Sequence, residues 1–305
     1  MKKVVVIGLS GESVFLRVDH FNNLGETVKA EERFVEAGGK GFNQALMLGK
    51  LGIDCSFITV LGSDQYAKEC VRVLQENNVK PCIITKDGLT DYAVIVTNKE
   101  GENNVIVSNN LSNMITFKDI LKYQEELDSA DICLLQLEYP YEVIKKVIEY
   151  CYQKGIKVIL NPAPSKLLDL DILRKISILI PNEHEIFSLF KPKEENKNEI
   201  IDILKELELC GVETTIVTRG SKSVLSYNNS KLKEYKVSKT KVVDTTGAGD
   251  TFCSGIIYGL INNYSLDACI NFAIQASRLS VNKKGVVNSL PTLKEILDQV
   301  SKQVK

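Results

Sequence analysis

Short apolar segments alternate with longer amphipathic segments through the middle of the chain, and this alternation restricts the fold more than any other feature. We predict strands at 132–137, 156–160, 177–180 and 214–218, and helices at 117–128, 140–153, 183–190 and 199–209. Strands that alternate with helices of about 10–15 residues form a parallel sheet covered on both sides. The sequence therefore predicts an α/β fold.

Two parts of the N-terminal third depart from this pattern. Residues 13–18 and 27–35 are short β-prone runs with interspersed charges, and residues 91–97 and 103–108 flank a turn that indicates a hairpin. Such alternation suits a sheet with one solvated face. We assign these runs to a small accessory sheet, and we interpret the charged segment 191–199 as a surface loop.

Two glycine-rich turns each precede an apolar helix, one at 38–45 and the other at 243–250. Glycine lets backbone amides approach a ligand closely, and amides at a helix start bind anions. Asp250 falls in the first turn of the second helix, where a carboxylate could accept a proton from a hydroxyl group that attacks a phosphate. The alternative is an acidic first-turn residue without a catalytic role.

Composition excludes several classes of protein. The 38 basic and 39 acidic residues give a net charge of −1, so we expect neither a nucleic-acid partner nor a membrane-seeking surface. We find no apolar stretch of about 18 residues, and the N-terminus reads as a strand rather than a signal peptide. The eight cysteines are scattered without a C-x-x-C pair, which favours reduced thiols and a cytoplasmic location. With two histidines, we expect no histidine-based metal centre.

Both glycine turns, about 200 residues apart, resemble the two signatures of the ribokinase-like (PfkB) family of sugar kinases. Shorter motifs in ribokinase-like order lie between them: 135–138, 161–164, 181–185 and 218–221. The resemblance covers essentially the whole chain. It implies a single domain over 1–305, with a three-layer α/β/α core, a mostly parallel central sheet and a β lid formed by about 10–36 and 91–109.

The resemblance implies an ATP-dependent phosphotransferase that phosphorylates a hydroxymethyl group of a small sugar. Asp250 would be the general base, and the amides of Gly247, Ala248 and Gly249 would hold the transferring phosphoryl group. The residues expected to contact the sugar are Gly39, Lys40, Asn43, Glu138 and Asp250. The alternatives are a plain helix-entry turn at 38–43 and a strand-end carboxylate at Glu138 with no ligand.

At the nucleotide end, the resemblance implies that Asn182 and Glu185 order Mg²⁺ and its waters beside ATP. Asn182 could equally be a helix N-cap with Glu185 completing a capping box, and both roles can hold together. Thr218 and Gly220 would contact the nucleotide, although Ser223 stands where ribokinases often have glycine. We expect His184 at the surface.

The resemblance also implies a K⁺ site and a homodimer formed through the lid. The expected cation ligands are Asp244, Thr246, Ser280, Lys283, Gly285 and Ser289.

The chain departs from ribokinases after the first strand, where Gly11 and Ser13 replace an asparagine and an aspartate that bind ribose. Each charge-assisted hydrogen bond contributes about 1.5–3 kcal/mol, so ribose is a doubtful substrate. A different polyol, a nucleoside or a phosphosugar is the alternative acceptor. From another class of function, a non-catalytic sugar-binding regulator also stays open.

Overall fold

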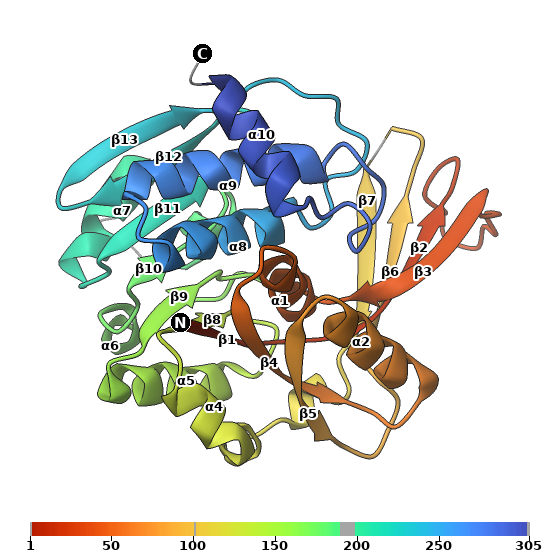
Figure 1. Ribbon diagram of the computed structural model, residues 1–305. Helices are drawn as coiled ribbons and strands as arrows, with labels where there is room; N and C mark the ends of the chain where they lie inside the picture. Colours follow the sequence, from red (N-terminus) through yellow and green to blue (C-terminus); the bar gives the residue numbers. More distant parts are fainter. Residues whose placement is uncertain (1, 101, 190–198, 304–305) are drawn as a thin grey trace.

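A mostly parallel sheet forms the centre of the computed structural model, which describes residues 2–100, 102–189 and 199–303. Within these ranges nine strands follow the order β13-β12-β11-β10-β9-β8-β1-β4-β5 (Figure 1). Only the β11–β12 and β12–β13 pairs are antiparallel. The strands are β1 (Lys3–Ile7), β4 (Asp54–Leu61), β5 (Val79–Thr85), β8 (Ile132–Leu135), β9 (Lys157–Leu160), β10 (Ile178–Leu179), β11 (Thr214–Thr218), β12 (Ser223–Asn228) and β13 (Lys231–Lys236).

Helices cover both faces of this sheet, as the sequence predicts (Figure 1). In β1, Val4 and Val6 join the hydrophobic cluster on one face, and Val5 and Ile7 join the cluster on the other. This alternation explains why the strand is apolar throughout. The first face is packed by α1 (Lys40–Lys50), α2 (Gln65–Glu76), α8 (Ala248–Ile261), α9 (Leu266–Ser280) and α10 (Leu293–Gln303), and the second by α3 (Phe117–Ile120), α4 (Gln124–Asp128), α5 (Tyr141–Lys154), α6 (Leu170–Leu173) and α7 (Ile200–Leu209).

A smaller sheet projects from one edge of the core in the order β3-β2-β6-β7 (Figure 1). Its strands are β2 (Gly11–Arg17), β3 (Glu32–Gly38), β6 (Tyr92–Thr97) and β7 (Asn103–Ser108). Strand β3 starts later than the predicted run at 27–35 and continues to the first glycine turn. We call this sheet the lid.

Several local predictions were wrong or incomplete. The edge strand β5 was missed because Pro81 and Lys80 interrupt its apolar pattern, although an edge strand tolerates proline. The predicted helix at 117–128 is broken at Tyr123, whose φ and ψ of −113° and 34° are not helical. The predicted helix at 183–190 is only a 3₁₀ turn, Glu185–Ser188. Apart from Glu199, the predicted surface loop at 191–199 lies outside the described residues.

The two glycine turns bring α1 and α8 together beneath the lid. Gly39 precedes α1 with a φ of 98°, and Gly247 precedes α8 with a φ of 75°, conformations that favour glycine. The Ser254 hydroxyl on α8 donates to the Gln44 carbonyl on α1 over 3.0 Å. A Cβ atom at Gly255 would lie 2.7 Å from the Ala273 Cα, so this glycine allows α9 to pack closely behind α8. The starts of both helices therefore face the same space.

Among the described residues, none of the helices combines the length and apolar character that a bilayer crossing requires.

Candidate active site

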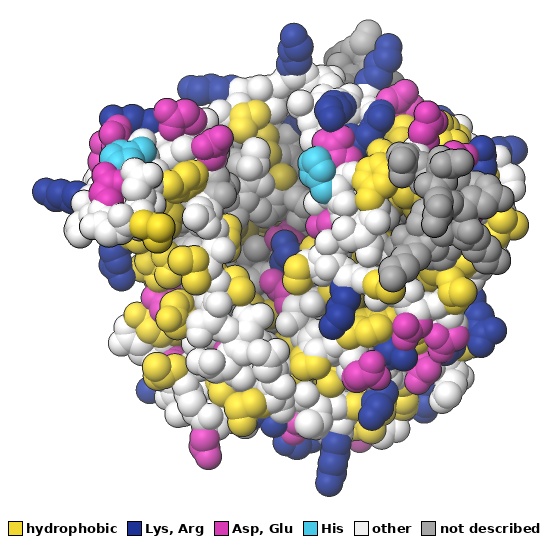
Figure 2. Space-filling model, turned by 180° about the vertical axis from the view of Figure 1, so that it is seen from behind, with side chains coloured by type: hydrophobic (Ala, Val, Ile, Leu, Met, Phe, Trp, Pro, Cys, Tyr) yellow, Lys and Arg dark blue, Asp and Glu magenta, His cyan; other side chains and the backbone are white. Residues whose placement is uncertain are grey.

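A cleft of about 360 Å³ lies where the lid meets the carboxyl ends of the parallel strands. The face shown in Figure 2 is hollowed, with acidic and basic side chains at the bottom of the hollow. In open α/β sheets, ligands bind at this edge. The cleft is lined by the lid residues Ile95 and Val105 and by Lys40, Asn161, Ala163, Ile180, Asn182, Glu185, Thr218, Thr245, Thr246, Gly247, Gly249, Asp250 and Cys253.

The Asp250 carboxylate lies at the inner wall of the cleft and is 6% exposed. Its Oδ2 accepts from the Asn43 side-chain amide over 2.9 Å, and its Oδ1 accepts from the Gln44 side-chain amide over 2.9 Å. A carboxylate has about four lone-pair sites, so both oxygens keep acceptor capacity for a further donor. The arrangement suits a carboxylate that receives a proton from a bound hydroxyl group.

The start of α8 presents backbone amides to the same cleft. The first amides of a helix have no partner within the helix, and the helix dipole adds positive potential there. Gly247 and Gly249 both line the cleft, and a Cβ atom added at Gly249 would have no protein atom within 4 Å. An anion can therefore approach this backbone closely.

Lys40 and Glu138 are charged neighbours of Asp250. The Lys40 amide donates to Glu138 Oε2 over 2.9 Å. Burial, opposed by the Lys40 ammonium group, raises the pKa of Glu138 to about 7. Burial alone would lower the pKa of Lys40, but the charges of Asp250, Glu138 and Glu185 outweigh it and raise that pKa. The lysine therefore stays cationic within a ring of carboxyl groups.

Asn182 and Glu185 line the cleft and also form a capping arrangement. The Asn182 side-chain oxygen accepts from the amides of His184 and Glu185, each over 2.8 Å, and the Asn182 amide donates to Glu185 Oε2 over 2.8 Å. Burial raises the pKa of Glu185. The capping bond uses Glu185 Oε2, so the carboxylate could also accept from a water molecule in the cleft. The His184 side chain is 90% exposed, so the histidine is at the surface, as expected.

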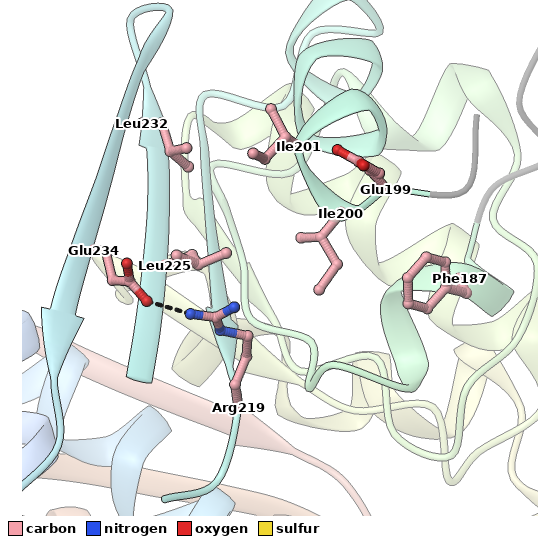
Figure 3. A pocket seen from close by; sticks show the side chains of 8 residues that line it. All are labelled: Phe187, Glu199, Ile200, Ile201, Arg219, Leu225, Leu232 and Glu234. Atoms are coloured by element: carbon pink, nitrogen blue, oxygen red, sulfur yellow. Dashed lines mark hydrogen bonds and ion pairs between the residues drawn. The ribbon is translucent and has the colours of Figure 1, made fainter. Parts of the chain in front are cut away.

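Neighbouring residues of the turn after β11 face two different pockets. Thr218 lines the cleft, whereas Gly220 is not part of the described lining. Arg219 points into a separate pocket of about 490 Å³ between α7 and the β12–β13 hairpin (Figure 3). There its guanidinium group contacts Glu234 and the Ser223 hydroxyl. Ser223 and Glu234 thus both hold the Arg219 guanidinium group at this pocket.

Among the residues predicted to bind K⁺, most through backbone oxygens, Asp244 links two others. Asp244 accepts from the Thr246 amide and hydroxyl over 2.9 and 2.7 Å, and from the Gly285 amide over 3.0 Å. The Ser280 and Ser289 hydroxyls donate to the nearby carbonyls of Ser277 and Val286, which leaves their own backbone oxygens as the groups that a cation would use. The Lys283 ammonium group lies 3.5 Å from a Glu295 carboxylate oxygen on α10.

From the sequence alone, we assigned no role to three buried amide side chains that connect to Asp250 through hydrogen bonds. Gln44, Gln136 and Asn161 are 0%, 1% and 8% exposed. All three occur inside the motifs that carry the family resemblance. The signal was a large polar side chain at positions where the surrounding pattern is apolar.

A family model described as "pfkB family carbohydrate kinase" matches residues 1–293. A ribokinase of Lactococcus lactis subsp. lactis (strain IL1403) is 32% identical over 297 residues, 97% of this chain and 96% of the relative. The solved structure of a ribokinase from Thermotoga maritima has a TM-score of 0.88 and 29% identity, and covers 99% of this chain and 100% of that one. The structure of Arabidopsis thaliana ribokinase complexed with ribose and ATP has a TM-score of 0.85 and 28% identity, and covers 98% of both chains.

The raised pKa of Glu138 predicts a pH-dependent stability. Folding raises this pKa from 4.5 to about 7, so the folded chain holds the proton more tightly. The stability contribution is complete below about pH 4.5 and is lost as the pH rises through 7. Relative to Glu138→Gln, the unsubstituted chain should lose about 1–2 kcal/mol of unfolding free energy between pH 5 and pH 8. Urea unfolding at both pH values measures this difference, and a constant difference would contradict the prediction.

Proposed function

The chain belongs to the pfkB family of carbohydrate kinases, and we propose that it phosphorylates a hydroxymethyl group of a small sugar with Asp250 as the general base. As the motifs predict, it is an ATP-dependent sugar kinase, a phosphotransferase with an alcohol group as acceptor. The observation that carries the assignment of Asp250 is its position. A buried carboxylate, held by two amide donors, lies in the first turn of the helix whose glycine-rich start faces the cleft.

In the proposed reaction, the sugar hydroxyl gives its proton to Asp250 as its oxygen bonds to the γ-phosphorus of ATP. The bond between that phosphorus and the β–γ bridging oxygen breaks, and ADP leaves. The amides of 247–250 and the Lys40 ammonium group stabilise the charge that shifts across the phosphoryl group. Positioning and charge stabilisation dominate this kind of reaction because it needs little covalent help.

The sugar would lie between Asp250 and Glu138. Asn43 Oδ1 is buried and has no hydrogen-bond partner among the described residues, although Asn43 Nδ2 donates to Asp250. Since buried polar atoms are normally paired, a sugar hydroxyl that donates to this oxygen would satisfy it. Glu138, Gly39 and Lys40 are the other sugar contacts that we propose. The Lys40 amide already donates to Glu138 Oε2 over 2.9 Å, so a sugar hydroxyl would have to share or displace that bond.

The nucleotide would lie along the carboxyl ends of β10 and β11. Asn182 and Glu185 would order Mg²⁺ through its waters, and Thr218 would contact the nucleotide. Gly220 lies in the same turn as Thr218 and has a φ of 57°, a conformation that favours glycine. Because glycine has no side chain, a nucleotide could approach the backbone there. We keep Gly220 as a backbone contact for ATP.

The resemblance does not identify the acceptor sugar, because Gly11 and Ser13 stand where it implies a ribose-binding asparagine and aspartate. We propose a polyol other than ribose, with a nucleoside or a phosphosugar as the alternative. Initial rates with MgATP and a panel of pentoses, hexoses, their phosphates and nucleosides would identify the acceptor. Sugar binding without turnover of any member would favour the non-catalytic regulator instead.

Asp250→Asn tests the catalytic base. The exchange keeps the size of the side chain but removes its ability to take a proton, so kcat should fall about 10²- to 10⁴-fold with the best acceptor of the panel. The midpoint of thermal unfolding should stay within about 5 °C, which separates lost chemistry from lost folding. Near-full turnover in this variant would rule out Asp250 as the base.

We also propose that K⁺ activates the enzyme by binding near Asp244. The Asp244 carboxylate accepts hydrogen bonds from the amides of Thr246, which lies just before α8, and of Gly285, so it links two of the predicted ligand segments. Turnover in KCl should exceed turnover in NaCl and in tetramethylammonium chloride at equal ionic strength. Asp244→Asn should reduce this preference. Equal rates in all three salts would reject the K⁺ site.

The lid gives a physical reason for a homodimer. Val35, Val14, Val94 and Ile106 pair directly across all four strands, so they lie in one row on the outer face. Ile95 and Val105 are on the opposite face, which lines the cleft. An exposed apolar row of this kind is stabilised when a second copy of the chain packs against it and removes it from water.

Ile106→Glu tests the dimer. Ile106 is 64% exposed, and its neighbour Val107, 59% exposed, points to the other face of β7. Sedimentation velocity should show a dimer of two 34.0 kDa chains for the unsubstituted protein and for Val107→Glu, and a monomer for Ile106→Glu. A monomeric unsubstituted chain at micromolar concentration would contradict the proposal.

A further inference from the structure

A chain of buried amides runs from the backbone of the central sheet to the Asp250 carboxylate. Asn161 Nδ2 donates to the Ile180 carbonyl over 3.0 Å. Gln44 Nε2 donates to Asn161 Oδ1 over 3.1 Å and to Asp250 Oδ1 over 2.9 Å. On its other side, Gln44 Oε1 accepts from Gln136 Nε2 over 2.5 Å.

The direction of every hydrogen bond in this chain is determined by its ends. The Ile180 carbonyl can only accept, so Asn161 must present its amino group there and its oxygen to Gln44. Gln44 must then donate to Asn161, and the same amino group faces Asp250. Its own oxygen is consequently turned to the amino group of Gln136. The network leaves no second orientation for the Gln44 amide.

We propose that Gln44 is a positioning residue for phosphoryl transfer, which orients the Asp250 carboxylate toward the acceptor hydroxyl group. Gln44 is 0% exposed, and both polar atoms of its amide are already paired with Asn161, Asp250 and Gln136, so it acts through Asp250 rather than on the substrates. Asn43 differs, because it has a free oxygen for the sugar as well as a bond to Asp250. This inference rests on the proposed role of Asp250 as the base.

The geometry explains why two donors are needed. With Asn43 alone, the carboxylate could rotate about its bond to the Cβ atom and still keep one hydrogen bond. A second donor on the other oxygen fixes the carboxylate plane. Asp250 lines the cleft, where a hydroxyl group must lie within hydrogen-bond reach of the carboxylate for proton transfer.

Gln44→Met tests the positioning role, since it keeps the length of the side chain and removes both hydrogen-bonding groups. With saturating MgATP and the best acceptor of the panel, kcat should fall about 10- to 100-fold. The KM values for sugar and ATP should stay within about threefold, because Gln44 contacts neither substrate. Unchanged kcat in a folded variant would overturn the proposal, and so would a loss confined to KM.

Gln275→Met is the matched control, because Gln275 is also a buried glutamine, 3% exposed, and its oxygen accepts from Arg278 on the same helix. It should lose stability but keep kcat. Thermal unfolding of both methionine variants separates destabilisation from mispositioning. If Gln275→Met lowers kcat as much as Gln44→Met at equal destabilisation, the effect is structural and the proposal fails.

Gln44→Glu provides a rescue that a structural role would not produce. When the introduced carboxyl group is protonated, it can donate to Asp250 and accept from Gln136, whereas the ionised form places a second carboxylate beside Asp250. Activity relative to the unsubstituted enzyme should therefore be highest at acidic pH and fall toward the Gln44→Met level as the pH rises. The other ionisable groups facing Asp250, which are Lys40, Glu138, Glu185 and Cys253, are common to all variants. A flat ratio across pH 5–9 would overturn the proposal.

Asp250→Asn keeps the two hypotheses distinguishable. If that variant is inactive and Gln44→Met is fully active, the base is correct and the positioning role is wrong. If Asp250→Asn is active, the proposed function itself fails.

Discussion

The contact between α1 and α8 buries the Asp250 carboxylate, and much of the site depends on how that charge is compensated. A buried ion without partners costs several kcal/mol even after the protein relaxes. Here successive residues of α1, Asn43 and Gln44, each donate to one carboxylate oxygen. The same helix begins at the Gly39 turn, which we assign to the sugar. Asp250 and the Gly39 turn are thus linked through one helix, and this link does not involve the lid.

Charge balance in the cleft gives a second constraint. Asp250, Glu138 and Glu185 all act electrostatically on Lys40, so three carboxyl groups share one ammonium group. Burial raises the pKa of Glu138 to about 7, which reduces the negative charge that the cleft carries near neutral pH, and burial also raises the pKa of Glu185. A polyphosphate would still meet a surplus of carboxyl groups. The amides at the start of α8 and a divalent cation brought with the nucleotide are what make the cleft favourable for ATP.

The parts of the fold that could be predicted are those in which neighbouring residues carry the signal. The apolar runs of β1 and β8 are buried on both faces, and the glycine turns before α1 and α8 need a positive φ at Gly39 and Gly247. Strand β5 was missed because an edge strand needs less apolar sequence than a central one. The role of Gln44 was missed for a different reason: its partners Asn161 and Asp250 are 117 and 206 residues away in the sequence. No local pattern reports that such residues meet.

The sugar end of the site shows how a missing side chain can reflect the path of the backbone. A Cβ atom at Gly11 would lie 2.3 Å from the Asp91 carbonyl oxygen, and the Glu12 amide donates to that same oxygen over 2.9 Å. The Asp91 carboxylate is in turn fixed by the amides of residues 110–112. Two chain crossings between core and lid therefore touch at Gly11, and no larger residue fits there unless they separate. Ser13 lies on a strand of the lid without this constraint on its backbone. If Gly11 stands for the asparagine that the resemblance implies there, that difference is linked to the backbone path at the lid crossing. The difference at Ser13 would concern the side chain alone, so the two need not have the same effect on the sugar that fits.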